Sequence, residues 1–142
     1  MSVVANIANS QTAGNGQQSI TADTIRAKSL HDSATAHYNA GDYRRALSLE
    51  KEAASLWKNA VGKNNETYGI FADDISRIHS LLNNIDSAII YSRQAAESYA
   101  NSVGKMNTRY ASALGNLAWY YSQAKNYDKS LEINNEVLKI YE

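Results

Sequence analysis

The chain has 142 residues, of which 44% are hydrophobic, and its 14 basic and 14 acidic side chains cancel to no formal net charge at pH 7. Such a chain can build the core of one globular domain, but it lacks the positive charge expected of a nucleic-acid binder or a basic membrane-surface protein. It holds no cysteine, which excludes disulfides and thiolate metal sites, and no apolar run of about 18 residues that could cross a bilayer.

Residues 1–22 carry no charged side chain and are rich in Ser, Asn, Gln and Gly. Gly14 and Gly16 are expected to break any helix that begins near Val3, so we predict a flexible polar leader; a docked remnant of a preceding helix is the alternative. The first cationic residue is Arg26, so the sequence shows no basic secretory signal, and a cytoplasmic location is the default expectation. The alternative is a chain from which a leader has been removed.

From residue 23 onward the sequence repeats itself every 42 residues, and such a period indicates a repeat architecture. The repeat predicts three units, over residues 23–64, 65–106 and 107–142. Its aligned columns include Asp23, Asn65 and Asn107; Asp42, Asn84 and Asn126; His37, His79 and Tyr121; and Trp57, Tyr99 and Tyr141.

Each unit is predicted to form two helices joined by a tight turn. Apolar residues recur at helical spacing, and an Asp or Asn able to act as N-cap precedes each predicted helix. Gly62 and Gly104 fall where a glycine would end the second helix. Turns this short favour antiparallel helix pairs. The expected helices cover 24–40, 43–61, 66–82, 85–103, 108–124 and 127–142.

This pattern resembles the tetratricopeptide repeat family, most clearly in Leu117-Ala118, Tyr121, Tyr127 and Val137-Leu138 of the third unit. The usual period is 34 residues, so 42 points to the longer subtype found in kinesin light chains and bacterial repeat proteins. The resemblance implies an all-α, right-handed superhelical solenoid of three antiparallel helix pairs. It also implies a protein-interaction scaffold without a cofactor, which binds a peptide or helix of another protein in a concave groove.

The resemblance further indicates which residues of the first helices face that groove. Tyr38, Arg77 and Trp119 are expected to contribute most, because Tyr, Arg and Trp dominate binding energy at interfaces; alternatively, Trp119 covers a neighbouring helix. The family's clamp for a C-terminal carboxylate is not matched by the residues present here. The predicted groove set is Lys28, His31, Asp32, Thr35, Tyr38, Asp73, Asp74, Arg77, Asn116 and Trp119.

No local motif for catalysis or metal binding is found. His37 and His79 share a column with a tyrosine, which favours packing, whereas His31 is expected to face the groove. Asp73 and Asp74 diverge by about 100° on a helix, so they are either a solubilising pair or groove residues that meet a cationic ligand. With no HExxH spacing and no thiolate, we expect no metal and no enzyme. Asn65-Glu66-Thr67 matches a glycosylation acceptor, but a helix N-cap is the favoured interpretation.

The last predicted helix carries more apolar residues than one partner helix can cover. A solenoid needs a polar outer face on its terminal unit, so we expect this face to be covered in a homodimer or by further repeats. The alternative function is therefore a sensory, regulatory or self-associating segment of a larger bacterial signalling protein. The residues expected to self-associate are Leu131, Val137, Leu138 and Tyr141.

Overall fold

The computed structural model describes residues 2–142, with side chains from residue 13 onward. Its described part consists of helices and the short turns between them, without a strand, and every helix except the first begins and ends within about one residue of the predicted bounds. The helices are α1 (Ser2–Asn39), α2 (Tyr43–Val61), α3 (Glu66–Leu81), α4 (Ile85–Ser102), α5 (Thr108–Gln123) and α6 (Tyr127–Tyr141).

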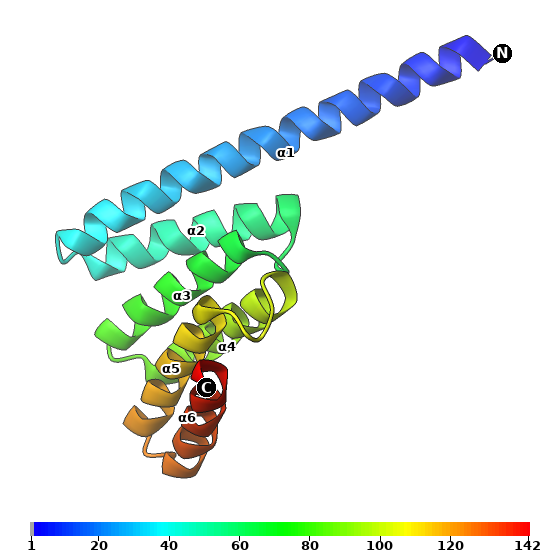
Figure 1. Ribbon diagram of the computed structural model, residues 1–142. Coiled ribbons are helices and arrows are strands. Elements are labelled where there is room, and N and C mark those ends of the chain that lie inside the picture. The colour runs from blue at the N-terminus through cyan, green and yellow to red at the C-terminus, as the bar shows by residue number, and fades with distance from the viewer. Residues whose placement is uncertain (1) are drawn as a thin grey trace.

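Each helix packs against the next one along the chain, from α1 on α2 to α5 on α6. Figure 1 shows the resulting stack of helix pairs, which turns progressively from α1 towards α6. The predicted all-α solenoid is confirmed. In a solenoid each repeat contacts the repeats before and after it. The first helices α1, α3 and α5 accordingly lie side by side, linked by the His31–Asp74 and Asp73–Asn116 contacts.

The turns between paired helices repeat their backbone geometry as well as their spacing. Gly41, Asn83 and Lys125 are 42 residues apart, and each has a positive φ, of 80°, 61° and 61°. Gly62 and Gly104, with φ of 98° and 90°, end the second helices as predicted. The left-handed backbone at these sites reverses the chain without a longer loop.

Most of the predicted N-caps are formed. The side-chain oxygen of Asn65 accepts a hydrogen bond from the backbone amide of Tyr68 at 2.9 Å and another from Trp57 Nε1 at 2.8 Å. The side-chain nitrogen of Asn65 donates to the Gly62 carbonyl. The N-cap interpretation of this residue is therefore confirmed. Asn84 makes no side-chain capping bond.

The start of the first helix differs from the prediction. Asp23 lies in the middle of α1 and caps nothing, because the helix is continuous from Ser2 to Asn39. Gly14 and Gly16 do not break it: each glycine costs about 1 kcal/mol in a helix interior but removes no backbone hydrogen bond, and no proline is present. The start of α1 projects past the end of α2 (Figure 1), and side chains 13–22 are all exposed. The flexibility of residues 1–22 and the division into three repeats stay predictions.

The core runs between the helix pairs and is built mainly from alanines together with large aromatic and aliphatic residues. Trp57 and Phe71 pack edge to face, with ring centroids 5.8 Å apart, and join α2 to α3. Ile75, Tyr99 and Leu114 continue the buried cluster into the second and third repeats. None of the described helices is long and apolar enough to span a membrane.

Candidate functional site

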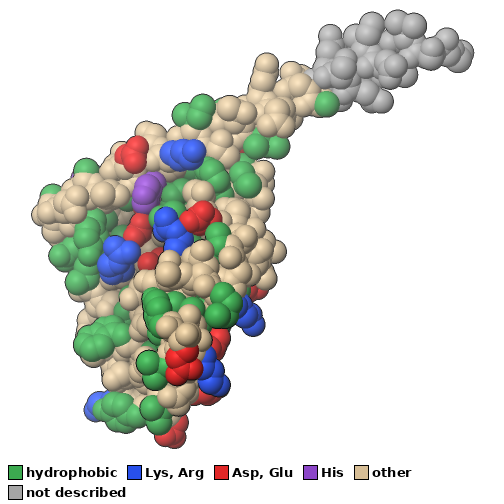
Figure 2. Space-filling view, viewed as in Figure 1, with side chains coloured by type: hydrophobic (Ala, Val, Ile, Leu, Met, Phe, Trp, Pro, Cys, Tyr) green, Lys and Arg blue, Asp and Glu red, His purple; other side chains and the backbone are tan. Residues whose placement is uncertain are grey.

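A pocket of about 200 Å³ opens between α1 and α3, with one wall from α2. Figure 2 shows acidic and basic side chains gathered beside a histidine in the hollow below α1. Five of the predicted groove residues line this pocket. They are His31, Thr35, Tyr38, Asp74 and Arg77, and they are joined there by Ala34, Asn39, Glu50 and Ile78.

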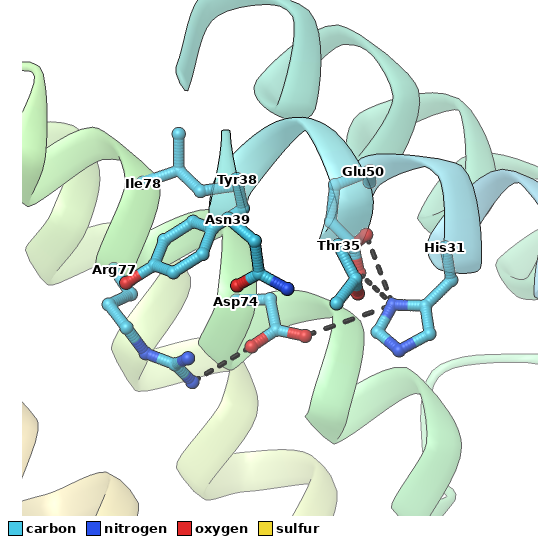
Figure 3. Close-up of a pocket in the computed structure, with 9 residues that line it drawn as sticks. His31, Thr35, Tyr38, Asn39, Glu50, Asp74, Arg77 and Ile78 are labelled. Carbon is cyan, nitrogen blue, oxygen red and sulfur yellow. Dashed lines mark hydrogen bonds and ion pairs between the residues drawn. The ribbon is translucent and has the colours of Figure 1, made fainter. Parts of the chain in front are cut away.

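His31 is the centre of the charged part of the pocket. Its Nδ1 lies 2.9 Å from Glu50 Oε1 and 3.1 Å from Oε2, and 3.8 Å from Asp74 Oδ2 (Figure 3). On its other side the His31 ring leans against Phe71, with ring centroids 5.2 Å apart. One imidazole therefore connects α1 to both α2 and α3.

Burial and neighbouring charge both change the proton affinity of these groups. The hydrogen bond to Glu50 raises the pKa of His31 above its usual value, and the charges of Glu50 and Asp74 add to this effect. Burial raises the pKa of Glu50, whose side chain is only 1% exposed, and burial also raises the pKa of Asp74. The site therefore holds two acids that resist ionisation beside a base that resists deprotonation.

The two adjacent aspartates point to different neighbours, as their helical spacing predicts. Asp74 reaches back to His31 on α1, while Asp73 Oδ1 accepts a hydrogen bond of 3.1 Å from Asn116 on α5. Arg77 holds both, at 2.8 Å from Asp74 and 3.5 Å from Asp73. These contacts join the side chains into a continuous polar row across α1, α3 and α5. Asp73 and Asp74, which lie in the middle of this row, are therefore not a merely solubilising pair.

The other predicted groove residues lie outside the pocket. Lys28 sits over the ring of Trp57, with Nζ 5.6 Å from its centroid, and Asp32 is exposed. Trp119 is 59% exposed on α5, and the choice between groove contact and cover for a neighbouring helix stays a prediction. Of the three residues expected to contribute most, the structure brings Tyr38 and Arg77 together and leaves Trp119 apart on α5.

Glu50 is the site residue that the sequence analysis missed. It falls in the buried stripe of α2 that also contains Ala46, Ala53 and Trp57. A single glutamate within this otherwise apolar stripe is the sequence feature that could have identified it as a site residue. The histidine predictions are confirmed in part. His79 is buried and stacks on Tyr91, but His37 is half exposed and pairs with Asp42 at 3.3 Å instead of packing.

The outer face of α6 is apolar and exposed. Leu131, Leu138 and Tyr141 are 61–63% exposed, whereas Val137 is partly buried against the core. The residues that occupy the Leu138 and Tyr141 columns in the earlier repeats are nearly inaccessible, since Ala96 is 6% and Tyr99 is 3% exposed. The α6 face thus has the chemistry of faces that are covered by a following helix in the earlier repeats.

Similarity to solved structures supports the fold. BtubC (BKLC) from P. vanneervenii matches with a TM-score of 0.76 at 18% identity, over 80% of this chain and 45% of that one. The nearly identical TPR-like repeats of a putative kinesin light chain from Podosopora anserina match with a TM-score of 0.70 at 15% identity, over 82% of this chain and 56% of that one. The chain thus spans about half the length of each. Comparison with curated protein sequences gave no match.

The sequence itself matches the tetratricopeptide repeat family over residues 26–66 and 111–142, which together make up half of the chain. The two matched ranges belong to the first and third of the repeats defined by the 42-residue period, and the match to the repeats of a putative kinesin light chain agrees with the resemblance to that subtype. The chain is therefore a member of the tetratricopeptide repeat family of protein-interaction scaffolds.

Proposed function

We propose that this chain is a non-catalytic scaffold that binds a peptide or helix of another protein along the first helices of its three repeats. The observation that carries this proposal is the polar row from His31 through Asp74, Arg77 and Asp73 to Asn116, with a pocket open at its α1 end. A cytoplasmic setting and the absence of enzymatic activity belong to the same proposal.

The row combines a fixed geometry with neighbouring side chains that offer contact area to a ligand. The His31–Asp74 and Asn116–Asp73 contacts cross between helices, and Arg77 pairs with both aspartates within α3. The side chains are therefore held in place before a ligand arrives, and most of the ordering cost falls on the ligand. Tyr38 and the aliphatic part of Arg77 offer contact area at the pocket (Figure 3), and the exposed ring of Trp119 offers it on α5. An extended peptide or a helix with polar and apolar side chains in alternation along its contact face suits such a surface.

The test is a pull-down from the source cell with the wild-type chain and a Tyr38→Ala, Arg77→Ala, Trp119→Ala variant. A matched control carries Arg44→Ala and Ile90→Ala, which alter exposed residues of the second helices α2 and α4. Circular dichroism first establishes that both variants remain helical. We expect a specific partner to be captured by the wild type and the control but not by the triple variant. A partner retained by the triple variant would show that the first helices are not the binding surface.

The exposed α6 face favours a second candidate function, self-association within a larger signalling assembly. Leu138 and Tyr141 stand in columns that are buried in the first two repeats, so a helix from another copy could cover them in the same way. A Leu138→Glu, Tyr141→Glu variant should then shift a dimer to monomer in sedimentation velocity. If the wild type is already a monomer at high concentration, this candidate fails.

A further inference from the structure

We propose that His31, Glu50 and Asp74 form a binding site for a divalent transition-metal ion, with Zn²⁺ as the best match. The three side chains come from three helices, yet their donor atoms all lie within 4.8 Å of one another. Ligands of a tetrahedral zinc ion stand about 2.0–2.2 Å from the metal, which places neighbouring donors about 3.3–3.6 Å apart. His31 Nδ1 is 2.9 Å from the nearer Glu50 oxygen and 3.8 Å from the nearer Asp74 oxygen, so small rotations suffice to surround an ion.

The charge at this site is not balanced by the protein alone. When the imidazole is neutral, as a metal ligand must be, the carboxylates of Glu50, Asp73 and Asp74 face a single cation, the guanidinium of Arg77. If all three carboxyl groups are ionised, two negative charges then remain uncompensated, one of them on a side chain that is 1% exposed. Burying an uncompensated carboxylate is costly. A protonated His31 would neutralise one of these charges, whereas a divalent ion would neutralise both.

The chain also contains an internal comparison, which shows that its helix packing does not require this set of residues. The position of Glu50 in the second repeat is Ser92, which is fully buried and donates a hydrogen bond to the Ala113 carbonyl at 3.2 Å. The position of Asp74 in the third repeat is Asn116, which makes an ordinary neutral-to-carboxylate hydrogen bond to Asp73. The α3–α5 junction thus packs with a hydroxyl and an amide at the places where the α1–α3 junction carries two carboxylates.

The ligand types select the class of ion. One imidazole with two carboxylates is a nitrogen and oxygen set that suits Zn²⁺ and neighbouring first-row ions, while Ca²⁺ and Mg²⁺ prefer oxygen ligands alone. All three residues line the pocket, so a fourth ligand position would open towards it (Figure 3). The inference therefore departs from the sequence prediction of no metal, which considered only ligands close together in the chain.

The experiment is a calorimetric titration of the tag-free chain with ZnCl₂ after EDTA treatment and removal of the chelator, paired with thermal unfolding in the presence of Zn²⁺ or EDTA. We expect one ion per chain and a higher melting temperature with Zn²⁺. His31→Gln and Glu50→Gln should each weaken binding at least about tenfold, because even residues behind the ligands change metal affinity by that factor. His37→Gln is the matched control: it removes a second histidine of α1, which pairs with the single carboxylate of Asp42 in the following turn, and it should leave binding unchanged.

Folding of the variants does not limit the test. His31 is partly exposed, whereas Glu50 is buried, so His31→Gln should retain the fold even where Glu50→Gln does not. Circular dichroism monitors the fold of both variants. A Co²⁺ absorption spectrum provides a second readout, since the visible bands of bound Co²⁺ should disappear in His31→Gln and persist in His37→Gln. Absence of stoichiometric binding to the wild type, or equal binding by wild type and His31→Gln, would overturn the proposal.

Discussion

Gly69 is a position where the structure and the sequence repeat make opposite predictions. It lies in α3, and the equivalent residues of the other repeats are Ala27 and Ala111. Because alanine occupies both equivalent positions, the repeat pattern predicts that Gly69→Ala stabilises the protein by about 1 kcal/mol, the usual gain when alanine replaces glycine inside a helix. In the structure, however, an added Cβ would lie 2.6 Å from Tyr99 Cε1 and 2.9 Å from Cδ1.

The magnitude follows from whether the ring can move. Tyr99 is 3% exposed and belongs to the main core cluster, so its ring has no free space into which to retreat. Overpacking of this kind costs about 1–3 kcal/mol. After the helix-propensity gain is subtracted, Gly69→Ala should be between neutral and about 2 kcal/mol destabilising.

Gly115→Ala provides the matched control, because Gly115 also lies inside a helix but an added Cβ there meets nothing within 4 Å. This variant should be stabilised by about 1 kcal/mol, so the two substitutions should differ by about 1–3 kcal/mol in urea unfolding followed by circular dichroism. Tyr99→Leu should recover part of the loss in the Gly69→Ala background. If Gly69→Ala is stabilised as much as Gly115→Ala, the packing argument is refuted.

Three further predictions concern local features. His79→Phe should remove an acid sensitivity: burial lowers the pKa of His79, and both ring nitrogens lack a hydrogen-bond partner. The stability from this residue is therefore complete above the unfolded pKa of about 6.5 and is lost as the pH falls through the lower folded value. The variant's advantage in unfolding free energy should accordingly be larger at about pH 5 than at about pH 7.5. Lys125→Gly should stabilise by about 1 kcal/mol in urea unfolding, because its φ of 61° suits glycine, whereas Asn83→Gly should change little since asparagine tolerates this region. Asn65→Ala should cost about 1–2 kcal/mol, as it removes an N-cap and the partner of a buried indole, whereas Asn84→Ala should be near neutral in the same assay.

Helix boundaries were predictable because the signals that set them are local and occur three times. A capping Asp or Asn and a glycine with positive φ act within a few residues of the helix end. The helix bounded by Asp42 and Gly62 accordingly matches its predicted range. The start of α1 lacks such a signal, because Asp23 has helix on both sides and the two glycines before it weaken a helix without ending it.

The candidate site was only partly predictable, because its central contact joins residues from different helices. His31 and Asp74 were assigned to the groove from their helix positions, and both line the pocket. Glu50 was not, since an isolated glutamate is ordinarily an exposed residue. Only the position of α2 relative to α1 and α3 shows that its carboxylate is buried beside an imidazole, and the helical period does not encode that position.

The exposed face of α6 shows most clearly that the position of a residue in the repeat predicts its type but not its burial. Trp57, Tyr99 and Tyr141 occupy one column and are all aromatic, yet their exposures are 9%, 3% and 63%. In a solenoid the burial of a side chain depends on the neighbouring repeat as much as on its own helix. The aromatic ring of Tyr141 therefore has the same capacity for packing as the buried members of its column. In the second repeat α5 follows α4 and packs on it, and no described helix takes that place after α6; a helix packed there as α5 packs on α4 is the kind of surface that would cover Tyr141.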